Sequence, residues 1–479
     1  MSAVLASRDH RFSLGLALAA LIPRLYVALA WAREPVWDGH YYHFGATRIA
    51  AGLGYSEDVL VGGHLTWSPW CHYPGGYSEF LGLFYKLLGS GLWVGPVLNA
   101  CVGALTVWIV HRLARMYLSH WRARIAGLLC AFHPGLMLYT AVLMSEPLAA
   151  ASVALAGYFA ARYRAHWAGI VLSGVVLGLS VLVRPTGLFV VPLLAFLFGG
   201  PTWRELLFRG VPKAAMAGVV TLLVVSPWTL RNCRVMDGCA LVSTNGGWNL
   251  AIGVISETGR FDTLRGSDGC PVVTGQVQQD RCWAEVGKRR ILERPGRWLS
   301  LIPLKLRHTY NHESFAAGYL GEANPEAWPE PRRAWWRQRM TISHHLLMLG
   351  TTLAAFGLVT PFTRRDRRFW IQAAGVASVL LFACLALQTA EPQLFYLIAL
   401  APLLVLMCLP GAPEQNHVGR FLFGLVFMTT LTHAVFFGDD RYHLTISPML
   451  CILAAAALRV SKPNLAADGD LLRNTGGTP

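Results

Sequence analysis

Long apolar runs recur along almost the whole chain, and they restrict its fold more than any other feature. A helix needs roughly 20 predominantly apolar residues to cross a bilayer, and the first such run extends from Phe12 to Trp31. Only 14% of the 479 residues are charged, whereas soluble domains carry about 25%. The sequence therefore predicts an all-α polytopic membrane protein. We expect about twelve transmembrane helices, at 12–32, 92–111, 125–143, 146–162, 167–183, 186–199, 213–230, 343–361, 369–389, 394–410, 419–437 and 443–459.

The distribution of lysine and arginine predicts the orientation of these helices. Basic loops alternate with loops that are poor in lysine and arginine, and basic loops stay in the cytoplasm. Both termini are therefore expected on the cytoplasmic side of a bacterial inner or plasma membrane. The same alternation explains the net charge of +15, so no nucleic-acid partner is expected.

With this orientation, the polar clusters of the chain fall on the extracytoplasmic face. They are the first outer loop (33–91), Ser145-Glu146-Pro147, Arg184-Pro185-Thr186-Gly187, a long loop (231–342), Glu391-Pro392-Gln393 and Gly438-Asp439-Asp440-Arg441-Tyr442-His443. Two amphipathic segments of the first loop, 43–53 and 80–88, are too short to span and are expected in the membrane interface. The long loop should be a small folded cap (231–342) between an N-terminal membrane module (1–230) and a C-terminal one (343–479).

The cap contains four of the ten cysteines. In an oxidising compartment they can form disulfide bonds. Proximity in sequence favours Cys233–Cys239 and Cys270–Cys282, although other connectivities are open. No Cys-x-x-Cys motif occurs, so a zinc ribbon is not expected.

Asp38 is a lone carboxylate among aromatic and histidine residues, just after the first apolar run. A carboxylate at a membrane edge costs free energy unless it is solvated or has a task. We interpret Asp38 as the candidate general base of a membrane enzyme, with an N-cap of the following helix as the alternative. Histidines of the same loop could hold a divalent ion with Asp38, but their spacing matches no tight site, so no metal is expected. These histidines are His40, His43, His64 and His72.

Several short motifs follow one another along this predicted outer face. They are Asp38 with Tyr41 and Tyr42, Gly52-Leu53-Gly54-Tyr55, Tyr73-Pro74-Gly75-Gly76-Tyr77-Ser78, Ser145-Glu146-Pro147-Leu148, Arg184-Pro185-Thr186-Gly187, Pro227-Trp228-Thr229-Leu230-Arg231-Asn232, Ser243-Thr244-Asn245-Gly246-Gly247-Trp248-Asn249-Leu250 and the 438–443 segment. In this order they resemble the membrane glycosyltransferases of the GT-C class. The closest type is family 39, which includes protein O-mannosyltransferases and lipid A aminoarabinose transferases.

The sequence departs from this family's pattern at several positions. The glutamate that usually follows the first aspartate is Gly39 here, and Gly75 and Ser78 replace family prolines. Glu391-Pro392-Gln393 lacks the Arg-Tyr pair that many members carry at this place. These departures concern donor preference more than the class of enzyme.

The resemblance implies a GT-C-type helix bundle and the inverting transfer of a sugar from a polyprenyl-phosphate donor to a lipid, glycan or protein acceptor. A base must take the proton of the acceptor hydroxyl, and arginines suit the charge on the leaving phosphate. The candidate ligands of the donor phosphate and lipid are Arg184, Arg231, Arg441, Tyr442 and His443. The candidate substrate contacts are Tyr41, Tyr42, Tyr77, Glu146 and Asn232.

Each of these residues also has a structural alternative. Arg441 could pair with Asp439 or Asp440, and Arg184 could be an interfacial arginine before a helix-starting proline. The remaining alternatives are a helix start for Glu146, solvation at the base of the cap for Arg231, membrane anchoring for the tyrosines and packing for His443.

Other functions are compatible with the same features. A polyprenyl-linked glycan ligase or polymerase would use the same carrier. A lipid-linked sugar flippase or transporter would place ionisable groups at mid-membrane and show inverted repeats. No convincing repeat is evident and the polar residues collect at one surface, so the sequence favours an enzyme. Gly39 also makes an inactive member conceivable.

Overall fold

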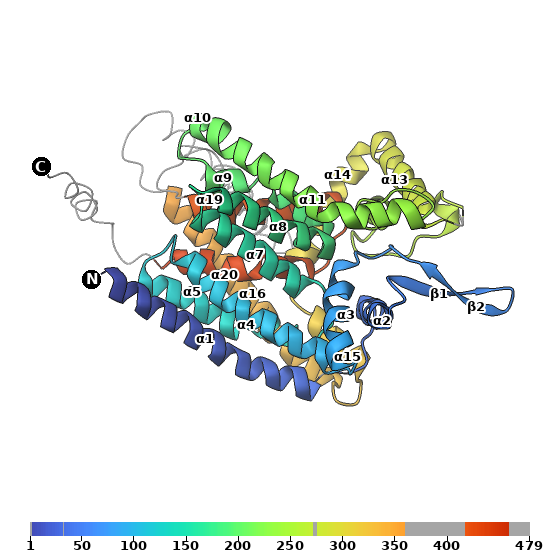
Figure 1. Cartoon of the computed structure of the whole chain (residues 1–479), viewed down its shortest axis with the longest axis horizontal. Helices are drawn as coiled ribbons and strands as arrows, with labels where there is room; N and C mark the ends of the chain where they lie inside the picture. The colour runs from blue at the N-terminus through green and yellow to red at the C-terminus, as the bar shows by residue number, and fades with distance from the viewer. Residues whose placement is uncertain (1, 32, 272–274, 360–416, 459–479) are drawn as a thin grey trace, which may run out of the picture.

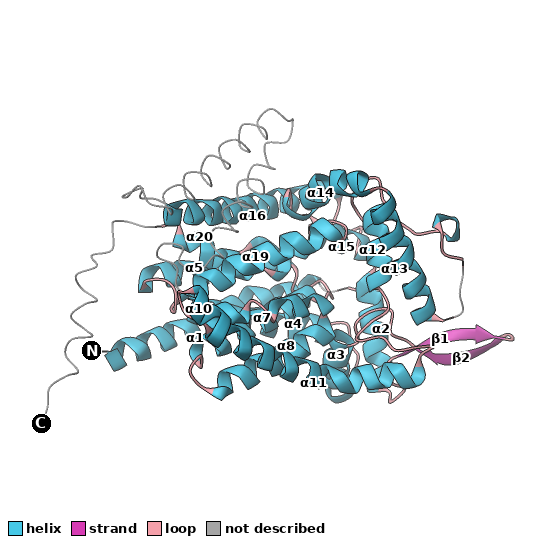
Figure 2. Ribbon diagram, turned by 90° about the horizontal axis from the view of Figure 1, so that it is seen from above, coloured by secondary structure: helices cyan, strands magenta, loops and turns pink. Residues whose placement is uncertain are grey.

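The structure is a computed structural model that describes residues 2–31, 33–271, 275–359 and 417–458. Helices dominate this part of the chain, and most of them run along one long axis (Figures 1 and 2). The expected spans at 369–389 and 394–410 and the Glu391-Pro392-Gln393 turn lie outside the described residues.

The N-terminal part forms a bundle of helices with the first loop at one end (Figure 1). Its longer helices are α1 (Ser2–Trp31), α4 (Val94–Ala114), α5 (His120–Phe132), α7 (Glu146–Arg162), α8 (Trp167–Val183) and α11 (Val211–Val235). Its short elements are α6 (Pro134–Leu138), η1 (Pro185–Val190), α9 (Leu194–Phe198), α10 (Trp203–Glu205) and η2 (Leu206–Gly210).

The described remainder is also helical. It contains α12 (Gly246–Ile255), η3 (Gly266–Asp268), α13 (Gln276–Glu293), α14 (Pro295–Tyr310), α15 (Phe315–Ala323), α16 (Glu330–Val359), α19 (His417–Val435), η4 (Tyr442–Thr445) and α20 (Ser447–Ala456). The predicted disulfide bonds Cys233–Cys239 and Cys270–Cys282 are both present. Lys305 of α14 donates hydrogen bonds to the carbonyl groups of Ala434 and Val435. The 231–342 segment is thus joined to α19, and its place outside the membrane stays a prediction.

Within the described residues, four segments are long and apolar enough to cross a membrane. They are Asp9–Trp31, Val94–Ala114, Trp203–Val235 and His417–Val435. The run expected at 125–143 is interrupted, because α5 ends at Phe132 and Pro134 starts α6. Proline lacks the amide hydrogen that would continue a helix. The total of about twelve spans stays a prediction.

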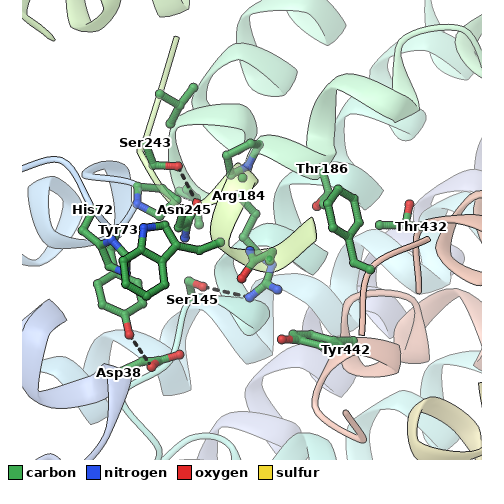
Figure 3. Close-up of a pocket in the computed structure, with 18 of the residues that line it drawn as sticks. Asp38, His72, Tyr73, Ser145, Arg184, Thr186, Ser243, Asn245, Thr432 and Tyr442 are labelled. Carbon is green, nitrogen blue, oxygen red and sulfur yellow. Dashed lines mark hydrogen bonds between the residues drawn. The ribbon is translucent and has the colours of Figure 1, made fainter. Parts of the chain in front are cut away.

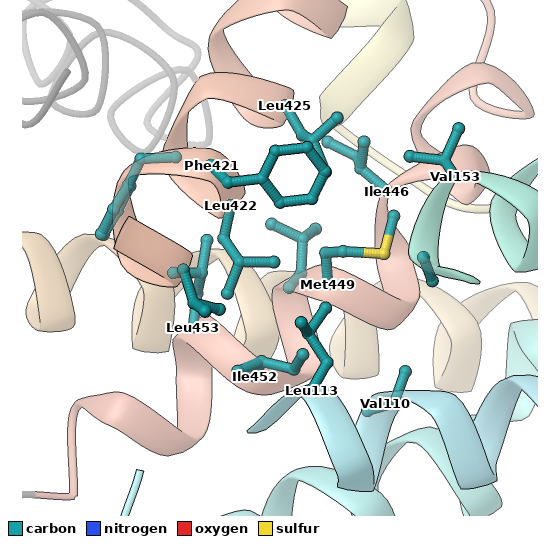
Figure 4. Packing of buried hydrophobic residues seen from close by; sticks show 14 of the residues in the cluster. Val110, Leu113, Val153, Phe421, Leu422, Leu425, Ile446, Met449, Ile452 and Leu453 are labelled. Atoms are coloured by element: carbon teal, nitrogen blue, oxygen red, sulfur yellow. The ribbon is translucent and has the colours of Figure 1, made fainter. Parts of the chain in front are cut away.

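A buried apolar core joins the N-terminal bundle to the last helices (Figure 4). Val110 and Leu113 of α4 and Val153 of α7 face the side chains of α19 and α20. Small residues of α7 permit close approach, since a Cβ at Gly157 would overlap the ring of Phe421. Close packing through small residues is one of the interactions that associate helices in lipid.

The first loop folds into two helices and a hairpin, so the all-α expectation is wrong at this point. Strands β1 (Ser56–Val61) and β2 (His64–Pro69) pair in antiparallel fashion and project from one end of the molecule (Figure 1). Gly62 and Gly63 form the turn with φ values of 58° and 81°, which two-residue hairpin turns require. A Gly-Gly pair between two strand-like runs is a known hairpin signal that the hydropathy-based reading missed.

Helices α2 (Asp38–Ala50) and α3 (Gly76–Leu88) replace the two predicted interfacial helices, each starting a few residues earlier than expected. The hydroxyl of Ser78 donates to the carbonyl of Tyr42 at 3.1 Å, which fixes α3 against α2. Ser78 and Gly75, which replace family prolines, both lie in close contacts: a Cβ at Gly75 would overlap the ring of Trp228.

We predict that Gly76→Ala destabilises the fold. An added Cβ would lie 2.7 Å from the carbonyl oxygen of Leu182 in α8, where the backbone cannot retreat. Overpacking of this kind typically costs about 1–3 kcal/mol, which thermal unfolding in detergent would detect. Gly15→Ala in α1 is the matched control, since a Cβ there meets nothing within 4 Å. Equal unfolding midpoints for Gly76→Ala and Gly15→Ala would contradict the close contact between Gly76 and α8.

Candidate active site

A cavity of about 490 Å³ opens among the first loop, α12, η1, α19 and η4 (Figure 3). Among its described lining residues, Asp38 is the only carboxylate and Arg184 and Arg441 are the only arginines. The other polar lining residues are Tyr42, His72, Tyr73, Ser145, Thr186, Ser243, Asn245, Asn249, Thr432, His433 and Tyr442. Much of the remaining wall is apolar, from Leu188, Phe189, Leu241, Val242, Ile252, Phe261, Phe436 and Phe437.

Asp38 is the first residue of α2, and its carboxylate is held from two sides. Tyr73 donates a hydrogen bond to Oδ1 at 2.8 Å, and Nη1 of Arg441 donates to Oδ2 at 2.5 Å. The N-cap alternative is not realised, because Trp37 occupies that position and no side chain caps the helix. Burial alone would raise the pKa of Asp38, but Arg441, the Tyr73 hydrogen bond and Arg184 outweigh it and hold the pKa below its usual range. The group is therefore ionised at neutral pH.

The backbone just before Asp38 has an unusual conformation. Trp37 has φ 52° and is the only non-glycine residue with positive φ in the described part of the chain. Such a conformation typically costs about 1–3 kcal/mol and persists only where the surroundings impose it. The indole of Trp37 contacts the rings of Phe315 and Tyr319 in α15. The first loop is thus fixed by α15 where it presents Asp38.

Gly39 has no room for a side chain. A Cβ there would overlap the hydroxyl of Tyr319 and lie 2.9 Å from the carbonyl oxygen of Leu143. The same hydroxyl accepts a hydrogen bond from the backbone amide of Val36 at 3.2 Å. Tyr319 therefore occupies the space that the glutamate expected at this position would need.

Arg184 is the C-cap residue of α8 and joins the cavity to a buried acid. Its Nη1 donates to Oε1 of Glu146 at 2.7 Å and to the hydroxyl of Ser145 at 3.2 Å (Figure 3 shows the second bond). Glu146 is fully buried and does not line the cavity. The contact that the structure shows for Glu146 is its ion pair with Arg184, whose guanidinium lies over the ring of Tyr442.

Arg441 reaches the cavity from the segment between α19 and η4. Besides Asp38, its Nε lies 4.0 Å from Asp439. That Nε has no hydrogen-bond partner among the described residues. Burial and the neighbouring Asp440 raise the pKa of Asp439 to about 6, against the opposing effect of Arg441. Asp440 instead accepts hydrogen bonds from the amides of Ser314 and Phe315 at the start of α15.

Several predicted site residues lie outside the cavity. Arg231 donates to the carbonyl groups of Tyr55 and Trp70 and so ties α11 to the first loop. Asn232 is buried and donates to the carbonyls of Ala240 and Val242. Both residues connect backbone segments, and neither lines the cavity.

The three tyrosines that the sequence predicts as substrate contacts also differ in whether they line the cavity. Tyr42 lines the cavity and donates to Ser145. Tyr77 is fully buried and donates to Asn99. Tyr41 is 46% exposed and stacks on Tyr73 outside the cavity. Of the three tyrosines predicted as substrate contacts, Tyr42 alone lines the cavity.

Tyr73, Ser145, Asn245 and Trp248 also line the cavity; they belong to motifs that are visible in the sequence, but the sequence alone predicts no role for them. Their contribution depends on tertiary structure, since Tyr73 meets Asp38 across 35 positions of sequence. His72 lines the cavity as well, and burial lowers its pKa.

The described residues show no metal-ligand grouping around Asp38. His43 instead forms a hydrogen bond with the hydroxyl of Tyr85 at 2.8 Å. His443, predicted as a phosphate ligand, is fully buried outside the cavity. Its Nε2 lies 3.7 Å from Oε2 of Glu313. Together with His344, these two residues form a grouping whose ligand atoms lie within 4.8 Å of one another.

Residues 74–230 match the family described as dolichyl-phosphate-mannose-protein mannosyltransferase. The resemblance to family 39 of the GT-C glycosyltransferases is confirmed over these residues. They include α3, the Glu146 and Arg184 motifs and most of α11. No curated protein sequence matches the chain.

Two solved structures show weak similarity. The archaeal oligosaccharyltransferase AglB from Archaeoglobus fulgidus, in complex with an inhibitory peptide and a dolichol-phosphate, is 13% identical at a TM-score of 0.45. The alignment covers 93% of this chain and 50% of AglB, so this chain spans half of that protein's length. ArnT from Cupriavidus metallidurans bound to undecaprenyl phosphate is 16% identical at a TM-score of 0.36, over 90% of this chain and 77% of ArnT. These similarities are too weak to indicate a function.

We predict that Gly39→Ala disturbs the site and that Tyr319→Phe compensates in part. The added Cβ overlaps the Tyr319 hydroxyl, and overpacking costs about 1–3 kcal/mol. The double variant should lose less stability than the sum of the single variants, measured as unfolding midpoints. Gly318→Ala is the control, because its Cβ would meet only the Trp37 ring at 3.7 Å. Strict additivity would show that Tyr319 is not the obstacle.

Proposed function

We propose that the chain is an inverting membrane glycosyltransferase that moves a sugar from a polyprenyl-phosphate donor to an acceptor hydroxyl. In this proposal Asp38 is the general base, and Arg184 and Arg441 hold the donor phosphate. The observation that carries it is the meeting of one carboxylate and two guanidinium groups in a single, mostly apolar cavity. The family match over residues 74–230 supports the same class of reaction.

The arginines suit a phosphate leaving group. Charge develops on the phosphate as the bond to the sugar breaks, and fixed cations in a buried site stabilise it. Arg441 lines the cavity, which places its guanidinium where a phosphate oxygen could accept a hydrogen bond from it. Burial by itself would lower the pKa of Arg184, but Glu146, Tyr42 and Tyr442 together outweigh it and hold that pKa above its usual range.

Asp38 suits the role of base. A phosphate leaves without being protonated, so a single carboxylate is sufficient, whereas inverting hydrolases need two. Tyr73 and Arg441 orient both carboxylate oxygens. Donor phosphate would compete for Arg441, which would loosen its grip on Asp38 and make the carboxylate a stronger base.

The rest of the cavity provides for the lipid and the sugar. Apolar walls suit the first isoprene units of a carrier, and Phe189, Phe261 and Phe436 lie among them. Asn245 and Trp248 could hydrogen-bond and stack against a sugar ring. The acceptor class, whether lipid, glycan or protein, and the extracytoplasmic location of the site remain part of the proposal. The proposal also includes that the protein lies among membrane lipids and that both termini are cytoplasmic.

We expect Asp38→Asn to lower kcat by about 100- to 10,000-fold, since asparagine keeps the shape but removes the base. The assay follows release of free polyprenyl phosphate from a panel of polyprenyl-phosphate sugars, with and without chelator. Asp58→Asn is the control: it lies in the same loop, with a side chain 44% exposed, and should turn over as wild type does. Normal turnover by a folded Asp38→Asn variant would refute the assignment of Asp38 as the general base. Wild type that binds carriers without cleaving them would point to a flippase.

We also expect Arg441→Gln to shift the pH profile. In wild type Arg441 holds the pKa of Asp38 low against desolvation, so the base stays ionised to acid pH. Without this cation, burial raises that pKa, and the acid limb of kcat/KM moves to higher pH. Arg184→Gln is the comparison: it should weaken donor binding with a smaller shift of the acid limb, because Arg184 contributes least to the pKa of Asp38. If the acid limb of kcat/KM does not move in Arg441→Gln, Asp38 is not the group whose ionisation controls it.

A further inference from the structure

A second polar cluster lies behind the segment that carries Arg441 and Tyr442. Glu313 comes from the loop between α14 and α15, His344 from α16 and His443 from η4. Their exposed fractions are 1%, 0% and 0%. None of the three lines the cavity of Asp38.

The atoms that these side chains turn toward one another lack hydrogen-bond partners. Within the described residues this holds for both carboxylate oxygens of Glu313, Nδ1 of His344 and Nε2 of His443. Burying a carboxylate without donors is strongly unfavourable, so such groups are normally paired or coordinate a metal. Nε2 of His443 lies 3.7 Å from Oε2 of Glu313, too far for a hydrogen bond. Four polar atoms without a hydrogen bond at one buried point therefore point to a cation between them.

The hydrogen bonds on the far sides of the rings define which nitrogens carry hydrogen. Nδ1 of His443 contacts the carbonyl oxygen of Thr309 at 2.6 Å, and Nε2 of His344 contacts that of Tyr310 at 3.0 Å. A carbonyl only accepts, so both nitrogens must be N–H donors. In neutral rings the opposite nitrogens then present lone pairs toward Glu313. Metal-ligating histidines almost always donate their other N–H in this way.

We propose that Glu313, His344 and His443 bind a divalent transition-metal ion, with Zn²⁺ as the best match to two imidazoles and one carboxylate. A cation neutralises the carboxylate and satisfies both lone pairs. The ligand atoms lie within 4.8 Å of one another, so side-chain adjustments suffice to close a coordination sphere.

Neighbouring contacts hold the ligands in place. A Cβ at Gly135 would overlap Oε1 of Glu313, so the carboxylate lies directly on the backbone of α6. Nδ1 of His133 accepts the amide of Leu136 at 3.4 Å. Its Nε2 therefore carries a hydrogen in the neutral ring and faces Oε2 of Glu313 at 4.0 Å. His133 is thus a positioning residue rather than a ligand.

The ion would connect three segments that are distant in sequence. It would hold η4, and with it Arg441 and Tyr442, against α16 and the 311–314 loop. The hydroxyl of Thr341 in α16 already accepts a hydrogen bond from the backbone amide of Glu313 at 3.1 Å. This structural role does not depend on sugar transfer. The metal site can therefore be tested separately from the proposed reaction.

The test measures metal in the full-length protein, purified in detergent with a tag that contains no histidine and without chelator. Elemental analysis should find about one zinc per wild-type chain. Glu313→Gln and His443→Gln should lose most of it. His111→Gln is the matched control, because His111 is also fully buried but bonds Ser13 in another part of the bundle. Chelation should lower the wild-type Tm, and added Zn²⁺ should restore it, whereas Glu313→Gln should respond to neither.

Two results would overturn the site. One is wild type that stays metal-free after incubation with Zn²⁺ and shows no change in Tm. The other is zinc that persists equally in Glu313→Gln and His443→Gln. If these variants fail to fold, wild-type protein loaded with Co²⁺ provides the test. We expect the visible d–d absorption of a low-symmetry site with nitrogen and oxygen ligands. Absence of this absorption would refute the proposal.

Discussion

The ion pair between Asp38 and Arg441 joins parts of the chain 403 positions apart, and the geometry of the cavity depends on it. Each partner is also held by contacts with α15. Asp38 is presented by α2 after a backbone that α15 constrains through Trp37. Arg441 is followed by η4 and preceded by Asp440, which caps the same α15. Helix α15 therefore sets the distance between the acid and the guanidinium that accompanies it.

The burial of this pair explains its chemistry. Removing two charges from water is unfavourable unless they neutralise each other and find further hydrogen bonds. Tyr73 supplies one to Asp38, and Glu146 performs the equivalent task for Arg184. Each of these charged groups thus has a partner: Asp38 and the two arginines line the cavity, and the buried Glu146 pairs with Arg184 from outside it.

The family departures have physical explanations in the packing. Gly39 and Gly75 lie where Tyr319 and the Trp228 ring leave no room for a Cβ. The space that a second carboxylate would need near Asp38 is filled by an aromatic residue from α15. The contact between Asp38 and Arg441 is compatible with this packing.

Hydropathy was sufficient to predict the helical character and several helix positions, because a chain in lipid must satisfy its backbone within each helix. Proximity in sequence was sufficient for Cys233–Cys239 and Cys270–Cys282, since short loops close readily. Asp38, Arg184, Arg441, Tyr42 and Tyr442 were also predicted as site residues and do line the cavity. Single-sequence patterns could not separate them from Arg231, Asn232, Tyr77 and His443. These residues carry the same chemical groups, and only the packing of distant helices decides whether a group faces the cavity or a backbone carbonyl. The tertiary structure alone brought Tyr73 to Asp38, filled the space beside Gly39 with Tyr319 and placed His443 against Glu313, because each of these contacts joins segments whose distance is set by the whole bundle.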